Sequence, residues 1–224
     1  MNKFLYYFML PKTIKEYYEK PYSKEFKAMV LETNGEKVVL DKTLFYPGGG
    51  GQACDVGKLN GFEVYFVNSS DGVIFHHVRE HNLRKGDVIK GEIDWERRYE
   101  LMKLHSAAHI VYYKFIEVFF NGDYEKAKVI GSNVAVSKSR IDFAMQESIA
   151  EKLVEVEKLS NEFIKEAHEI ITKYLDAEKR VWVCDKYEMP CGGTHVKNTS
   201  EIGEIKLKRK NLGKGKERVE IMLA

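Results

Sequence analysis

Two short pairs of metal-binding residue types constrain the fold of this chain more than any other feature of its sequence. His105 and His109 are four residues apart in a stretch with helical periodicity, and positions i and i+4 of a helix lie on one face about one turn apart. Cys191 and His195 have the same spacing on a turn rich in proline and glycine. Three imidazoles and one thiolate suit tetrahedral Zn²⁺. One zinc ion per chain is therefore predicted, provided that the fold brings together pairs separated by 81 residues.

The spacing alone leaves a simpler explanation open. Single pairs of either kind occur by chance in many chains, so the four residues could be independent core or surface residues. The cysteine count favours the metal site, because three cysteines form no even disulfide framework and a chain of this length can bury a core without one. That pattern is typical of a reducing compartment, where a cysteine is more often a metal ligand than half of a disulfide.

The composition is that of a soluble globular protein, with 44% hydrophobic and 31% charged residues. The apolar run at residues 4–10 is too short to span a membrane and lacks the small-residue cleavage site of a signal peptide. A cytoplasmic location without membrane contact is expected. The sequence indicates no oligomeric state.

The net charge of the chain is small, but positive residues are concentrated near its C-terminal end. A formal net charge of +2 is too close to neutral to indicate a nucleic-acid partner. A basic, glycine-containing loop between Lys206 and Arg218 could nevertheless meet phosphates, or it could be an ordinary solvated hairpin. The candidate phosphate-binding residues are Lys208, Arg209 and Lys210.

The hydrophobic pattern changes period near residue 94, which predicts two domains, 1–93 and 94–224. The first domain contains several short strands. An Asn34-Gly35 pair predicts one hairpin turn and the cluster ending at Gly72 predicts another. Short strands at this spacing are typical of a small β-barrel or a sandwich.

The second domain mixes helices and strands. A helical stripe runs from Trp95 to Phe119 and ends at Asn121-Gly122, and a second helical pattern begins near Gln146. Shorter apolar runs near 169–171, 181–183, 204–207 and 219–223 indicate strands. The predicted class is α+β, with a small N-terminal β-barrel domain followed by an α+β domain that holds all four candidate ligands.

The sequence motifs around these two residue pairs are more specific than the spacings of the pairs. Asp94-Trp95-Glu96-Arg97-Arg98, His105-Ser106-Ala107-Ala108-His109, Arg140-Ile141-Asp142-Phe143 and Cys191-Gly192-Gly193-Thr194-His195 occur in that order. They resemble the editing domain of alanyl-tRNA synthetase and its free-standing relatives, the AlaX proteins. The segment from Phe45 to Gln52 resembles the glycine-rich motif of the longer AlaX class, and it contains Gly48, Gly49, Gly50, Gly51 and Gln52.

The resemblance implies an aminoacyl-tRNA hydrolase. AlaX proteins act in trans on tRNA(Ala) mischarged with serine and, in some members, glycine, and their substrate is the acceptor end of that tRNA. A β-barrel precedes the editing domain, and the family's zinc ligands match His105, His109, Cys191 and His195. Two alternatives stay open: a catalytically weak, zinc-stabilised RNA-binding module, and an editing enzyme for another mischarged tRNA such as Ser-tRNA(Thr).

Substrate selection is where this chain departs from the family pattern. The segment expected to bind substrate is Val129, Ile130, Gly131, Ser132 and Asn133. The family usually has threonine or glutamine just before the glycine matching Gly131, and often threonine at Ala108. A site that hydrogen-bonds a hydroxyl discriminates better than apolar fit, so Ser132 and Asn133 are the candidate substitutes, and altered selectivity that tolerates glycine is predicted.

Other polar residues are assigned supporting roles. Gly48–Gly51 could form a nest of N–H groups for a phosphate, or a tight loop that packs the two domains together, with Gln52 and Asp55 structural. Ser106 projects about 100° away from His105 around a helix and is predicted to be a surface or packing residue. Arg97 and Arg98 are predicted to pair with Asp94 and Glu96 at the helix start, or to contact tRNA.

Overall fold

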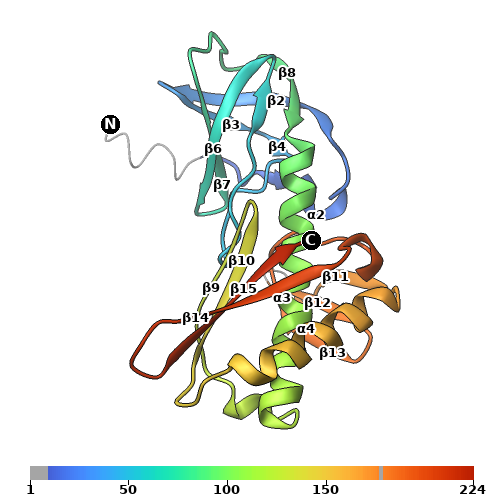
Figure 1. Cartoon of the computed structure of the whole chain (residues 1–224). Helices are drawn as coiled ribbons and strands as arrows, with labels where there is room; N and C mark the ends of the chain where they lie inside the picture. Colours follow the sequence, from blue (N-terminus) through green and yellow to red (C-terminus); the bar gives the residue numbers. More distant parts are fainter. Residues whose placement is uncertain (1–9, 177–178) are drawn as a thin grey trace. The chain divides into compact units, whose positions relative to one another are not determined.

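The computed structural model describes residues 10–176 and 179–224 (Figure 1). The described residues form two compact units, of which the first is residues 10–49 with 53–98 and the second is residues 50–52 with 99–176 and 179–224. Residues 50–52 therefore belong with the second unit, although both flanking segments belong with the first. The apolar run at 4–10 lies, except for Leu10, outside the described residues. Among the described residues, no helix combines the length and apolar character needed to cross a membrane.

The first unit is built mainly from antiparallel strands. Six of them pair in the order β2-β3-β7-β6-β5-β8, and β8 also pairs with β2, which closes the barrel. The elements of this unit are β1 (Ile14–Lys15), α2 (Glu16–Glu19), β2 (Glu25–Asn34), β3 (Lys37–Leu40), β4 (Lys42–Thr43), β5 (Gly57–Leu59), β6 (Phe62–Ser70), β7 (Val73–Val78) and β8 (Val88–Ile93).

Both predicted hairpins are present, and turn geometry explains them. Gly35 lies between β2 and β3 with φ of +59°, and Asp71 and Gly72 join β6 to β7 with φ of +51° and +83°. Positive φ at both central residues, as at Asp71 and Gly72, is what a type I′ turn requires, whereas positive φ at the first central residue alone, as at Gly35, fits a type II′ turn. Both turn types match the right-handed twist of the paired strands.

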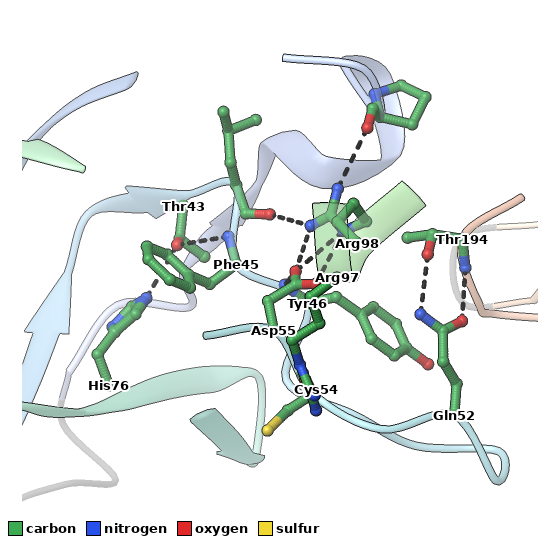
Figure 2. Close-up of polar contacts among 12 residues, drawn as sticks. Thr43, Phe45, Tyr46, Gln52, Cys54, Asp55, His76, Arg97, Arg98 and Thr194 are labelled. Atoms are coloured by element: carbon green, nitrogen blue, oxygen red, sulfur yellow. Dashed lines mark hydrogen bonds and ion pairs between the residues drawn. The ribbon is translucent and has the colours of Figure 1, made fainter. Parts of the chain in front are cut away.

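A buried ion pair organises the end of the barrel unit (Figure 2). Arg98 and Asp55 are both fully buried and hydrogen-bonded to each other. The Asp55 carboxylate also accepts a hydrogen bond from the backbone N–H of Tyr46. Arg98 also donates to the carbonyl oxygens of Leu44 and Pro21. Each charge is thus paired and further hydrogen-bonded, as burial requires.

The predicted role of Arg98 is therefore wrong, while the structural role predicted for Asp55 is seen. A fully buried guanidinium neither pairs with Glu96 at the helix surface nor reaches a phosphate. Arg97 donates to the carbonyl oxygen of Cys54, and Asp94 accepts from the backbone N–H of Arg97 at 3.1 Å. Asp94 acts as a helix cap rather than as an ion-pair partner, because the barrel supplies Asp55 from a distant part of the sequence.

The described part of the second unit contains two sheets and two long helices, which confirms the α+β class. One sheet has the order β14-β15-β10-β9 and the other β11-β12-β13. The elements are α3 (Trp95–Phe120, in this unit from residue 99), β9 (Val129–Ala135), β10 (Lys138–Ala144), α4 (Ala150–Lys165), β11 (Ile170–Tyr174), β12 (Arg180–Cys184), β13 (Tyr187–Pro190), β14 (Ile205–Asn211) and β15 (Lys216–Leu223), with short 3₁₀ helices at Tyr124–Lys126 and Thr199–Glu201.

Packing of the helices on the four-stranded sheet fixes the position of α3. The rings of Phe115 and Phe143 stack with centroids 3.9 Å apart, and Ser139 of β10 donates to the carbonyl oxygen of Leu104. α3 ends as predicted at Asn121, whose φ is +52°, whereas α4 begins at Ala150 rather than near Gln146. The helix that carries the two histidines is therefore held against the four-stranded sheet through Phe115 and the backbone of Leu104.

Candidate metal centre

Four side chains from two separate segments of the second unit meet in one cluster. His105 and His109 lie on α3, and Cys191 and His195 lie just after β13. One potential ligand atom from each lies within 4.8 Å of the others. The Cys191 sulfur is 3.2 Å from Nε2 of His195 and 3.6 Å from Nε2 of His105. The structure therefore brings together all four residues that the spacing singled out, as a group that could hold a metal ion.

Glycine allows the turn after β13 to approach α3 so closely. A Cβ on Gly193 would lie 2.2 Å from Cε1 of His105 and 2.5 Å from its Nδ1, far inside van der Waals contact. The N–H of Gly193 also lies 3.4 Å from the sulfur of Cys191. The glycine at position 193 of the Cys-Gly-Gly-Thr-His motif thus has a steric cause, since a larger residue would push Cys191 and His195 away from His105 and His109.

Burial sets the protonation states of the cluster. It lowers the pKa of His105 from the usual 6.5 to about 4 and holds the pKa values of His109 and His195 well below 6.5, with repulsion from the neighbouring histidines adding to the effect. Burial also raises the pKa of the Cys191 thiol to about 11. At pH 7 the cluster offers three neutral imidazoles and a thiol, which a divalent cation can deprotonate on binding.

The cluster also contains an unsatisfied buried atom. Nδ1 of His109 is buried and has no hydrogen-bond partner among the described residues. A buried polar atom without a partner costs about 1–3 kcal/mol, and such atoms commonly mark the place of an ion or a water. This observation and the chemistry of the donor set both fit a metal ion with nitrogen and sulfur ligands.

Two further side chains contact the outer nitrogens of the histidines. Gln52 places Oε1 2.8 Å from Nδ1 of His105, and Ser106 places its hydroxyl 3.1 Å from Nδ1 of His195. The Ser106 hydroxyl also accepts from the backbone N–H of Val196. Ser106 is fully buried, which excludes the predicted surface role and fits the packing role, but its hydroxyl also contacts a candidate ligand, which the prediction did not include. Helical spacing relates Ser106 only to its own helix, whereas its partner lies 89 residues away.

The segment predicted to bind substrate forms the start of β9, on the edge of the four-stranded sheet. Val129 and Ile130 are exposed. A Cβ on Gly131 would lie 3.2 Å from Oδ2 of Asp142, a carboxylate held by two arginines. Asn133 donates through Nδ2 to the carbonyl oxygen of Gly51, so this part of β9 lies beside the end of the glycine-rich segment.

The glycine-rich segment has an unusual backbone. Gly48, Gly49, Gly50 and Gly51 have φ values of +75°, +136°, +57° and +90°, a run that only glycine adopts at low cost. The carbonyl oxygen of Gly51 accepts from the N–H of Val134 at 2.8 Å. Phosphate contact and domain packing stay predictions for this run, but its last residue, Gln52, contacts a candidate ligand directly.

The basic segment predicted as a loop is largely a strand. Lys208, Arg209 and Lys210 lie on β14, which pairs with β15, and the connecting turn is confined to residues 212–215. Arg209 makes two hydrogen bonds to the buried carboxylate of Glu217. Lys208 and Lys210 are exposed. The segment is therefore a β-hairpin in which Arg209 forms an ion pair with Glu217, and phosphate contact by the hairpin stays a prediction.

Known proteins match both ends of the chain. Residues 1–97 match the family described as tRNA synthetases class II (A), and residues 183–220 match the threonyl and alanyl tRNA synthetase second additional domain. The chain is 38% identical over 218 residues to the alanyl-tRNA editing protein AlaX-M of Pyrococcus horikoshii, a match that covers 96% of this chain and 100% of the relative. The chain belongs to the AlaX-M family of alanyl-tRNA editing proteins.

The other relatives include a second AlaX-M protein and a larger enzyme. AlaX-M of Methanosarcina barkeri is 35% identical over 237 residues, covering 90% of this chain and 95% of the relative. The alanine–tRNA ligase of Methanococcus maripaludis strain C7 is 36% identical over 228 residues, which covers 91% of this chain but only 25% of the ligase. The resemblance inferred from the motifs is thus confirmed, and the AlaX-M chain corresponds to about a quarter of such a ligase.

Uptake of zinc by the metal-free protein at pH 7 is expected to release about one proton per ion, because the Cys191 thiol must ionise whereas the imidazoles carry no extra proton. The apparent affinity should weaken about tenfold for each unit of pH decrease between roughly pH 8 and pH 6. Calorimetric titration in buffers of different ionisation enthalpy measures the proton count. Cys191→Ala should bind zinc more weakly and release none, and release of three protons by the wild type would contradict the neutral histidines.

Proposed function

We propose that this protein hydrolyses the ester bond between a wrongly attached amino acid and tRNA(Ala), with serine as the main substrate and glycine as a second. It would act in trans in the cytoplasm, on tRNA charged by a separate synthetase. Family membership supports the reaction class, and the buried cluster of His105, His109, Cys191 and His195 is the observation that carries the site. In this proposal residues 1–93 form a β-barrel domain and residues 94–224 form the editing domain.

We propose that the cluster holds one Zn²⁺ ion. When bound, zinc supplies an electrophile that can polarise a carbonyl, lower the pKa of water towards about 7, or orient the substrate. The chain's own residues set the conditions: Gly193 lets the turn close on α3, Ser106 holds the ring of His195, and burial keeps the imidazoles neutral. With all four side chains bound no open position remains, so a structural or orienting role suits the full set and a catalytic role needs one ligand to leave or a fifth to join.

The exposed start of β9 is the proposed selectivity segment. Val129 and Ile130 supply no hydrogen-bonding side chain, so recognition of a serine hydroxyl would fall to Ser132 or Asn133. One amide N–H of Asn133 is already used on Gly51. A segment with fewer groups for a hydroxyl loses less when the hydroxyl is absent, which supports the proposal that glycine is tolerated.

A second candidate substrate follows from one of the matches. The domain matched by residues 183–220 is shared between threonyl and alanyl tRNA synthetases, so Ser-tRNA(Thr) is the alternative substrate. An RNA-binding module without activity is the other alternative. Measurement of deacylation on defined tRNAs separates all three.

Seryl- and glycyl-tRNA(Ala) should both be deacylated by the wild type, whereas alanyl-tRNA(Ala) should be spared. Cys191→Ala should bind zinc more weakly and lose about 100-fold or more in rate, because loss of a ligand should cost at least as much as the 10- to 100-fold loss usual for an outer hydrogen-bond partner. His168→Ala serves as the matched control, since that histidine belongs to the same unit and lies outside the cluster, and it should keep both zinc and activity. Cleavage of Ser-tRNA(Thr) but not Ser-tRNA(Ala), or zinc binding without any cleavage, would contradict the proposal.

The exposed face of β14 is the proposed tRNA-binding surface. Lys208 and Lys210 are two residues apart on a strand, so they project from the same face about 7 Å apart. Arg209 is less suited to this role, because its guanidinium binds Glu217, which is only 3% exposed. Phosphate contacts of exposed lysines would supply affinity that falls with salt.

The double variant Lys208→Ala/Lys210→Ala should bind tRNA more weakly, and the slope of log affinity against log salt should fall by about two. The double variant Lys158→Ala/Lys165→Ala removes the same charge from α4 and should leave the slope unchanged. Filter binding or fluorescence anisotropy at several salt concentrations measures both. Equal slopes for the two double variants would remove β14 from the proposed surface.

A further inference from the structure

We propose that Gln52, the residue that ends the glycine-rich segment, is a positioning residue of the metal centre: it holds the His105 ring with its proton on Nδ1, so that the Nε2 lone pair faces the metal. This inference rests on the zinc site proposed above. It concerns a side chain that is not itself a ligand and that lies 53 residues before the histidine it contacts.

The orientation of the Gln52 amide is decided by Thr194. The backbone N–H of Thr194 can only donate, and it lies 3.0 Å from Oε1 of Gln52. The Gln52 nitrogen, Nε2, lies 2.8 Å from the hydroxyl oxygen of Thr194, which can accept. Figure 2 shows the two contacts side by side. The atom that Gln52 presents to His105 is therefore the carbonyl oxygen, an acceptor.

An acceptor next to Nδ1 determines the tautomer of His105. Nδ1 lies 2.8 Å from Oε1 of Gln52, so it must carry the hydrogen. A neutral imidazole has one N–H, and the other nitrogen then has a free lone pair. That other nitrogen, Nε2, is the atom that faces the sulfur of Cys191 at 3.6 Å. Gln52 therefore selects the tautomer that can bind a metal on the side where the other ligands lie.

The position of Gln52 is itself fixed by neighbouring backbone. Gln52 forms an isolated parallel bridge with Val134 of β9 and is 3% exposed. The carbonyl oxygen of Gly51 accepts from the N–H of Val134 and from the amide of Asn133. A Cβ on Gly51 would lie 3.0 Å from the carbonyl oxygen of Ser132. Glycine at this position therefore allows the segment to lie close enough to β9 for the next side chain to reach His105.

Gly193 closes the arrangement from the other side. A Cβ there would lie 2.7 Å from Oε1 of Gln52 as well as 2.5 Å from Nδ1 of His105. A larger residue at position 193 would overlap these two atoms. Glycine there lets Thr194 hydrogen-bond to the Gln52 amide while the same amide hydrogen-bonds to His105. Residues 50–52, α3 and the turn that carries Cys191 are thus joined through one side-chain amide, which assigns the end of the glycine-rich segment a role at the metal.

Removal of this amide should weaken metal binding by about 10- to 100-fold, the effect usual for an outer hydrogen-bond partner of a ligand. Gln52→Met keeps the length of the side chain without its acceptor. Gln52→Glu keeps acceptors for both His105 and Thr194 and should bind zinc within about threefold of the wild type, or more tightly, because a carboxylate raises the basicity of the ring. Asn161→Met is the matched control: Asn161 makes two hydrogen bonds to the backbone of Ile205, away from the cluster.

Two measurements test the inference. Competition with a chromogenic chelator gives the zinc affinity of the wild type and the three variants. Long-range ¹H–¹⁵N NMR of the metal-free protein at pH 7 assigns the proton of His105 to Nδ1 or Nε2 without any metal or activity. We expect Nδ1–H in the wild type and in Gln52→Glu, a mixture in Gln52→Met, and a loss of zinc affinity in Gln52→Met alone.

The outcomes separate the inference from the proposal on which it rests. A wild type that binds no zinc would refute the metal site, whatever the tautomer. A wild type that binds zinc but has the His105 proton on Nε2 would overturn the role of Gln52, even if Gln52→Met fails to fold. Equal losses of zinc affinity in Gln52→Met and Asn161→Met would also overturn it, because they would reflect general destabilisation of the fold.

Discussion

The burial of three imidazoles and a thiol within 4.8 Å of one another is the constraint on which the second unit depends. Polar groups taken out of water must find partners, and Nδ1 of His105 and Nδ1 of His195 find them at Gln52 and Ser106. The third histidine has a buried nitrogen without a partner among the described residues. The close packing of α3 against the turn after β13 makes sense when a cation completes the group, since it would bind the free lone pairs and ionise the thiol.

The same segments support the metal site and form the proposed selectivity segment. β9 carries Val129 and Ile130 at its exposed start, and a few residues later it fixes Gly51 through Val134. Gly51 in turn places Gln52 against His105. A substitution in β9 can therefore change substrate choice directly or alter the metal centre through its neighbour. Affinity for zinc and preference between serine and glycine should be measured on the same variants for this reason.

Local patterns in the sequence predicted the parts of the fold that local physics determines. The hairpin turn at Asp71-Gly72, the helix that carries His105 and His109, and the end of that helix at Asn121 all follow from backbone preferences and periodicity. The strand β10 was missed because its alternation of polar and apolar residues is short, covering only Arg140, Ile141, Asp142 and Phe143. Asp142 is buried in the structure through its ion pairs with Arg140 and Arg218, which the alternation does not predict.

Contacts between distant segments were the part that sequence could not supply. Spacing alone found both ligand pairs, yet the roles of Ser106 and Gln52 depend on partners 89 and 53 residues away. The sequence predicts Arg98 at the helix surface, whereas in the structure it is buried and paired with Asp55 of the barrel unit. In each case the position follows from packing of a whole unit, and a helical wheel or a turn motif contains no information about it.

The central claim is that His105, His109, Cys191 and His195 form one zinc site, and X-ray absorption at the zinc edge of the purified protein tests it most directly. The account predicts a first shell with three nitrogen scatterers at about 2.0–2.1 Å and one sulfur at about 2.3 Å. The sulfur should disappear in Cys191→Ala. A first shell made only of oxygen or nitrogen atoms in the wild type, or a sulfur signal that survives in Cys191→Ala, would contradict it.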